Sequence, residues 1–168
     1  INGQYNKAVE YIDRCLELAQ PDSPNRTNYI LGKAAVLGMA YTKTSDNDYL
    51  AKAIEQYESL LPKMPSNTVI LNNLAYMLAD GDMRLEEALE YAERAHRIKP
   101  NDPGLLDTYA YVLYKNGKYN QAAEYLQSAK QLYEQEAVSA PAEVYEHLGM
   151  IKEKLGANLE AVAAYKQA

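Results

Sequence analysis

The chain has 168 residues, of which 48% are apolar, and a formal net charge of −6 with an isoelectric point near 5.0. This acidic balance, without a basic stripe, argues against nucleic acid as a partner, because phosphate binding requires clustered lysine and arginine. No apolar run approaches the roughly 18 residues that a membrane span needs, and a single cysteine excludes an internal disulfide.

The chain reads as a series of helices, because its apolar residues recur three and four positions apart. No stretch shows the strict alternation of a half-buried strand. We expect one domain over 1–168, with a single helix in 1–20 and helix pairs in 27–65, 67–100, 102–140 and 141–168. The stripe in the first helix consists of Tyr5, Ala8, Val9, Ile12, Cys15 and Leu16.

Capping residues and glycines mark helix ends. Asp102 followed by Pro103 predicts an N-cap and a first helical residue, because the carboxylate accepts amide protons and proline has none to lose. Gly81, Gly117 and Gly156 stand where a left-handed residue is expected to end the first helix of a pair.

Three segments depart from regular spacing. We expect a polar loop at 44–48, a lengthened link at 20–25, and about one extra helical turn in the second helix of 102–140, from residues 133–140. Each is interpreted as a tolerated surface extension, with contact to a partner as the alternative.

The positions of the two ends of the sequence bear on whether the chain is part of a longer protein. The start at Ile1 and the end at Ala168 both fall inside predicted repeats, so we interpret the chain as a piece of a longer protein. Uncovered apolar end faces then predict self-association. The end-face residues are Val9, Ile12 and Leu16 at one end and Val162 and Tyr165 at the other.

An alanine recurs at intervals of 45, 35, 34 and 39 residues, at positions 8, 53, 88, 122 and 161. In four of the five copies a large apolar residue follows four positions later, whereas Ala92 is small. Such a period indicates a single supersecondary unit repeated along the chain. A stacked array offers a long surface to a partner and no enclosed pocket.

These positions resemble the tetratricopeptide repeat, a unit of two helices, A and B. The small residues that the family places within helix A are matched by Gly38, Ala75, Ala110 and Gly149. The closing proline is matched by Pro65 and Pro100, whereas Gln20 and Glu134 replace it elsewhere. The resemblance implies an all-α, right-handed α-solenoid of antiparallel helix pairs with about nine helices.

The resemblance also implies a concave groove lined by helix A. The matching positions are Met39, Lys43, Asn72, Asn73, Tyr76, Asp107, Thr108, Tyr111, Tyr114, Lys115, His147 and Met150. Tyr76, Tyr111 and Tyr114 form the preferred binding patch, since tyrosine combines a rigid apolar body with a polar tip. The alternative is that these tyrosines only pack against neighbouring helices.

Relatives that clasp an anionic peptide terminus pair an asparagine with lysine and arginine. Asn73 matches the asparagine, but it is surrounded by Val69, Asn72, Asp107 and Thr108 without basic partners, so this specificity is not expected.

The predicted function is a non-catalytic scaffold that binds a peptide or protein through the groove. The alternative is a substrate-recruiting or assembly module of a larger enzyme or of a bacterial export complex. Two short segments, 72–76 and 106–109, resemble those of bacterial repeat proteins. Partner identity and cellular compartment stay open.

Residues capable of chemistry are few. His96 lies late in a predicted helix among Arg94, Arg97 and Lys99, where positive charge is favoured. His147 stands near Glu143 and Glu146 and could form a surface pair, but it lacks a second ligand at metal-binding spacing. Cys15 is interpreted as a buried structural thiol. We therefore expect no metal, no cofactor and no catalysis by this segment.

Overall fold

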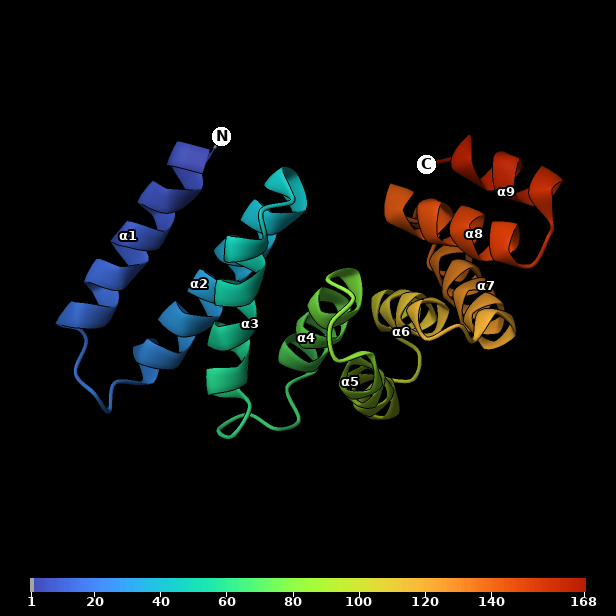
Figure 1. The fold of residues 1–168 in the computed structure, drawn as a ribbon. Helices are drawn as coiled ribbons and strands as arrows, with labels where there is room; N and C mark the ends of the chain where they lie inside the picture. Colours follow the sequence, from blue (N-terminus) through green and yellow to red (C-terminus); the bar gives the residue numbers. More distant parts are fainter. Residues whose placement is uncertain (1) are drawn as a thin grey trace.

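A computed structural model describes residues 2–168, so the expectation drawn from Ile1 lies outside the described residues. The described chain forms nine helices that follow one another in an open arc (Figure 1). Their bounds are α1 (Asn2–Leu18), α2 (Pro24–Thr44), α3 (Asn47–Leu60), α4 (Thr68–Asp80), α5 (Leu85–Ile98), α6 (Pro103–Lys115), α7 (Tyr119–Gln135), α8 (Ala142–Lys154) and α9 (Asn158–Tyr165). The predicted all-α solenoid is confirmed. How the chain divides into repeats stays a prediction.

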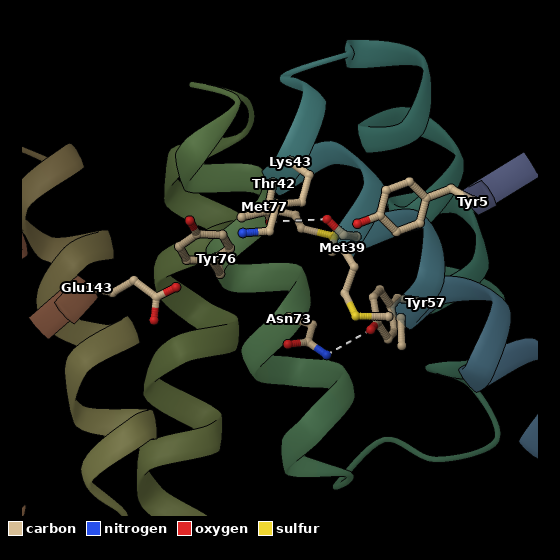
Figure 2. Close-up of a pocket in the computed structure, with 11 residues that line it drawn as sticks. Tyr5, Met39, Thr42, Lys43, Tyr57, Asn73, Tyr76, Met77 and Glu143 are labelled. Carbon is tan, nitrogen blue, oxygen red and sulfur yellow. Dashed lines mark hydrogen bonds between the residues drawn. The ribbon is translucent and has the colours of Figure 1, made fainter. Parts of the chain in front are cut away.

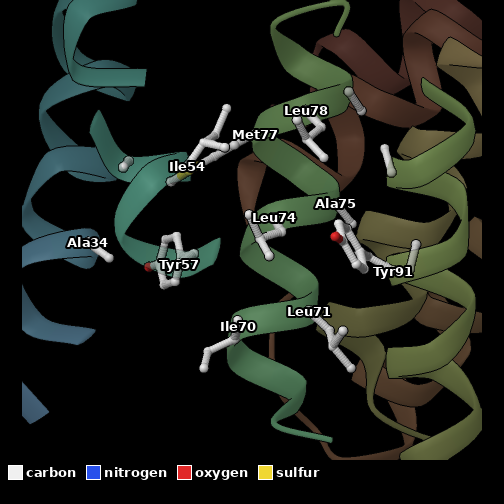
Figure 3. Close-up of a cluster of buried hydrophobic side chains, with 14 of the residues drawn as sticks. Ala34, Ile54, Tyr57, Ile70, Leu71, Leu74, Ala75, Met77, Leu78 and Tyr91 are labelled. Atoms are coloured by element: carbon white, nitrogen blue, oxygen red, sulfur yellow. The ribbon is translucent and has the colours of Figure 1, made fainter. Parts of the chain in front are cut away.

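Helix α4 shows how the array is held together. Leu74 and Ile70 face Tyr57 of α3, while Leu71 lies on the side of Tyr91 of α5 (Figure 3). Leu71, Leu74 and Ile70 are all 0% exposed. Full burial of such a side chain contributes about 1.5–3 kcal/mol. A helix buried on two sides links one helix pair to the next.

Small residues allow the two helices of a pair to approach closely. The repeated alanines Ala53, Ala88 and Ala122 are 0% exposed. A Cβ added to Gly149 would lie 2.3 Å from Cε1 of Tyr165, so the α8/α9 contact in this arrangement leaves no room for a side chain at that position. The small residues that recur in the sequence thus mark positions where the two helices of a pair are in close contact.

The predicted cap at Asp102 is confirmed. Its carboxylate accepts hydrogen bonds from the backbone amides of Gly104 at 3.1 Å and Leu105 at 3.2 Å, and Pro103 is the first helical residue. Asn67 caps α4 in the same way.

The prediction for the turn glycines is correct at two positions and wrong at the third. Gly117 and Gly156 have φ of 75° and 76°, whereas Gly81 has φ of −76°. In the segment between α4 and α5 the left-handed residues are Asp82, with φ of 51°, and Arg84, with φ of 43°. The absence of a side chain at Gly81 serves close packing, because an added Cβ would lie 2.7 Å from a methyl carbon of Leu50.

The extra residues near position 44 do not form the predicted loop. Helix α2 continues to Thr44 and α3 begins at Asn47, with only Ser45 and Asp46 between them. The helix ends next to the insertion absorb it: α2 ends six residues after Gly38, against five after Ala75 in α4, and α3 begins six residues before Ala53, against three before Ala88 in α5. Helix α2 has 21 residues, against 13 in α4, mainly because it begins 14 residues before Gly38, whereas α4 begins seven before Ala75. Helix α7 has 17 residues, against 14 in α5, which agrees with about one extra turn.

The exposed apolar residues at the first end differ from those expected. Val9 packs against the core, and Ile12 and Leu16 are half-buried. Tyr11 and Leu18 are exposed instead. At the other end, Val162 and Tyr165 are exposed as expected, and Leu159 is also exposed. None of the described helices combines the length and apolar character needed to cross a membrane.

Replacing Ala53 by Leu is expected to lower the free energy of unfolding by about 1–3 kcal/mol, because the added methyl groups overpack the α2/α3 contact. Urea unfolding followed by circular dichroism measures this change. Ala51→Leu is the matched control, since Ala51 lies in the same helix and is exposed. Equal stability of the two variants would contradict the close-approach interpretation.

Candidate partner-binding groove

A groove of about 450 Å³ opens between α2 and α4 on one face of the solenoid (Figure 2). Helix α2 supplies one wall through Met39, Thr42 and Lys43, and α4 supplies the other through Asn73 and Tyr76. The remaining lining residues are Tyr5, Ala35, Gly38, Tyr57, Met77 and Glu143. Residues from α1, α3 and α8 thus border the groove together with those of α2 and α4.

The wall formed by α4 holds an oriented amide. Nδ2 of Asn73 donates a hydrogen bond of 2.8 Å to the hydroxyl of Tyr57, which is 1% exposed (Figure 2). This bond uses one amide donor. A second donor and the carbonyl oxygen can therefore serve an extended peptide backbone.

Four of the twelve predicted site residues line this groove: Met39, Lys43, Asn73 and Tyr76. Three predicted residues, Thr108, Tyr111 and His147, are buried at 6%, 5% and 8% exposure. Asn72, Asp107, Tyr114, Lys115 and Met150 are half-buried and do not line the groove. Their role as partner contacts stays a prediction.

The three tyrosines of the predicted patch do come together. The ring centroids of Tyr76 and Tyr111 lie 5.6 Å apart, and those of Tyr111 and Tyr114 lie 6.3 Å apart. Lys115 lies over the Tyr111 ring at 5.9 Å and pairs with Asp82 at 2.6 Å. Tyr111 is buried and packs between helices, as the alternative interpretation states. Of the three tyrosines, Tyr76 borders the groove.

A shared carboxylate ties three A helices together. Asp80 of α4 accepts hydrogen bonds from the hydroxyls of Tyr41 of α2, at 2.6 Å, and Tyr111 of α6, at 2.7 Å. We call these three residues the polar clasp. Burial and the bond to Asp80 raise the pKa of both tyrosine hydroxyls, so both keep their protons at neutral pH.

His147 is more deeply placed than the sequence indicated. Its Nδ1 lies 2.8 Å from Oδ1 of Asp107, and its ring stacks on Tyr111 at 4.4 Å. The predicted surface pair with Glu143 and Glu146 is therefore wrong. The partner of His147 lies 40 positions away in the sequence, on the preceding A helix, which the spacing within one helix could not reveal.

His96 and Cys15 also differ from expectation. His96 does lie in the last turn of α5, but its side chain is half-buried and packs against the rings of Tyr109 and Tyr125, with centroids 5.6 and 5.4 Å away. Cys15 is exposed, so the prediction of a buried thiol is wrong. No group of three potential metal ligands is brought together in residues 2–168.

Sequence reasoning missed four residues with polar groups that border the groove: Tyr5, Thr42, Tyr57 and Glu143. Thr42 lies one position before Lys43, so the helical period alone could have included it. Tyr5 and Glu143 come from α1 and α8, and their approach depends on the curvature of the array. No signal within a single repeat encodes that curvature.

Carboxylates surround the hydroxyl of Tyr76. Burial first, and then the negative charges of Asp80, Glu143, Asp107 and Glu146, raise the pKa of Tyr76 to about 12. The α8 side of the groove therefore carries a negative field.

Comparison with known families gives two matches. Residues 82–168 match the family described as anaphase-promoting complex, cyclosome, subunit 3, and residues 1–22 match the tetratricopeptide repeat. The chain is also 35% identical over 117 residues to a TPR repeat-containing protein of Pseudomonas aeruginosa. That alignment covers 67% of this chain and 19% of the relative, so the chain spans about a fifth of the relative's length.

Solved structures show the same fold at low identity. A MamA double mutant from strain RS-1 superposes with a TM-score of 0.71 at 13% identity, covering 99% of this chain and 84% of that one. MamA from Desulfovibrio magneticus RS-1 gives 0.60 at 15%, covering 98% and 91%. A chain of the APC/C hetero-tetramer Cut9–Hcn1 gives 0.77 at 17%, covering 98% and 30%.

Replacing Tyr111 by Phe is expected to lower the free energy of unfolding by about 1–3 kcal/mol, because a buried hydroxyl bond to a carboxylate is lost. Tyr41→Phe, which removes the other bond to Asp80, should act in the same direction. Urea unfolding measures both. Tyr11→Phe is the control, since Tyr11 is 73% exposed. Equal stability of the Tyr111 variant and this control would show that the polar clasp contributes nothing.

Stability is expected to fall as the pH rises above about 10. The pKa of Tyr76 is raised from 10.0 to about 12, and that of Tyr109 to the same value, so the unfolded chain loses these protons first. The stabilisation is complete below pH 10 and is lost as the pH approaches 12. Urea unfolding at a series of pH values tests this. Tyr76→Phe should flatten the fall, and an unchanged profile in that variant would contradict the shift.

Proposed function

Because the chain belongs to the tetratricopeptide-repeat family, we propose that it is a non-catalytic scaffold that binds a protein partner through the groove between α2 and α4. The observation that carries this proposal is the preformed groove of about 450 Å³. Ligand sites of this kind combine apolar and aromatic walls with a few placed polar groups.

The lining suits an extended peptide segment. Met39 is 54% exposed and offers an adaptable apolar contact, and Tyr76 supplies a rigid aromatic one. Asn73, oriented by Tyr57, can pair with the peptide backbone through its remaining donor and acceptor. Met39 of the α2 wall and Tyr76 of the α4 wall would then select side chains of the peptide, and Asn73 of the α4 wall would bind its backbone.

The polar groups of the groove suit binding better than catalysis. The hydroxyl of Tyr76 keeps its proton because its pKa is raised, and Tyr57 is engaged by Asn73. Neither forms the nucleophile and base pair that covalent catalysis requires. The structural relative Cut9 occurs in a hetero-tetramer, which supports a protein as the partner here.

A recruiting or assembly module within a larger protein is the second candidate. It would use the same groove, and it is favoured because the match to the Pseudomonas relative covers only 19% of that protein. In the first candidate the repeat array itself holds the partner as a scaffold. In the second, the array brings the partner to another part of the larger protein.

Replacing Met39 by Glu is expected to weaken partner binding by about tenfold, because a charged side chain would occupy the apolar wall. The wild type and the variant serve as baits in extract of the source cell, and the affinity of the recovered partner is then measured with purified proteins. Met83→Glu is the matched control, since Met83 is 37% exposed and does not line the groove.

Loss of the partner from both variants would indicate a general defect. Retention by the Met39 variant at wild-type affinity would contradict the groove as the binding site. Tyr111 is not a suitable position for this test, because its side chain is buried and bonded to Asp80.

A further inference from the structure

The charges that border the groove are unevenly distributed. On the α8 side, Glu143 lines the groove and Glu146 lies one turn further along the helix, and both are exposed. Within the described part of the chain, neither carboxylate takes part in an ion pair. Two acidic side chains are therefore available to an incoming ligand.

The deeper carboxylates do not offset this charge. Asp80 is held by two tyrosine hydroxyls, which are neutral donors, so it keeps its full negative charge. Asp107 contacts His147. The nearby cation Lys115 is paired with Asp82. Lys43 lines the groove from α2 and forms no ion pair within the described residues, so the groove carries positive charge on its α2 side and negative charge on its α8 side.

The ring of Tyr76 lies on the same side of the groove as Glu143, whose side chain extends toward it (Figure 2). A cation between a carboxylate and an aromatic face gains both an ion pair and a cation–π interaction. Arginine suits this place best, because its planar guanidinium can pair with a carboxylate and stack on a ring together.

The part of the groove around Met39 is apolar, whereas Thr42 and Lys43 of the same helix are polar. The side chain of Met39 lies between Tyr5 and Tyr57, and Met77, which is 6% exposed, lies beside it on the side of Tyr76 (Figure 2). This part of the groove can receive an aliphatic or aromatic side chain, because removal of apolar surface from water is favourable.

Building on the proposed groove function, we propose that the preferred occupant is an extended, cationic peptide segment. A lysine or arginine of the segment lies between Glu143 and Tyr76, and an apolar residue lies on the wall of Met39 and Met77. The charge complementarity of the α8 side carries this choice, and an anionic segment would meet repulsion at the same place.

The test uses three pools of short, amidated, fluorescein-labelled peptides. All pools share a random mixture of leucine, tyrosine, alanine and serine, and they differ only in one fixed central residue, which is arginine, glutamine or glutamate. Fluorescence anisotropy at low ionic strength gives the affinity of each pool for the whole chain. We expect the arginine pool to bind about tenfold more tightly than the glutamate pool, and the preference to shrink as salt is added.

The double variant E143Q and E146Q is expected to reduce this preference to about twofold. The matched control is E86Q. Glu86 lies, like Glu143, in the first turn of its helix, is exposed, and does not border the groove. E86Q removes a negative charge from the first turn of a helix, as E143Q does, and with it the favourable interaction of that charge with the helix N-terminus. Because Glu86 lies away from the groove, E86Q should leave the preference for the arginine pool unchanged.

Equal binding of the arginine and glutamine pools would overturn the cationic preference and leave the groove function intact. Tighter binding of the glutamate pool would overturn it as well. If no pool binds, an extended cationic peptide is not the ligand, and the Met39→Glu measurement with the captured partner then decides separately whether the groove recruits a folded protein.

Discussion

Burial of each A helix on two sides is the constraint on which the rest of the structure depends. Helix α4 is covered by α3 of the preceding pair and by its own partner α5, and its inward residues are fully removed from water. Small buried side chains such as Ala53 and Ala88 let the two helices of a pair approach closely. Stability is therefore distributed over contacts between neighbours, and the surface left on the inner side of the A helices is free to carry a binding groove.

The same packing determines which inner residues a partner can reach. Tyr111 and His147 were expected to contact a ligand, yet both are buried by bonding and stacking between successive A helices. Tyr76 remains at the border of the groove because the groove lies between α2 and α4. Residues at equivalent repeat positions thus have different roles, which depend on how their neighbours in adjacent repeats are paired.

Much of the fold could be predicted from the sequence, because helix periodicity, the recurring alanines and the cap at Asp102 are local signals. The left-handed residue at Asp82 could not, since Gly81 is small for close packing and not for its backbone angle. For the candidate site, positions within one repeat identified Met39 and Asn73. The contributions of Tyr5 and Glu143 depend on curvature, which results from many contacts between repeats and has no signature in a single unit.

The double hydrogen bond at Asp80 has a mechanical consequence. Tyr41 and Tyr111 belong to α2 and α6, and α4 lies between these helices. A repeat array behaves as a spring, because each unit contacts mainly its neighbours. A side chain that holds the units before and after it acts as a short crosslink on the inner side of the coil. It stiffens the middle of the spring against stretching, so pulling the two ends apart would extend the terminal helix pairs before the segment that contains the groove.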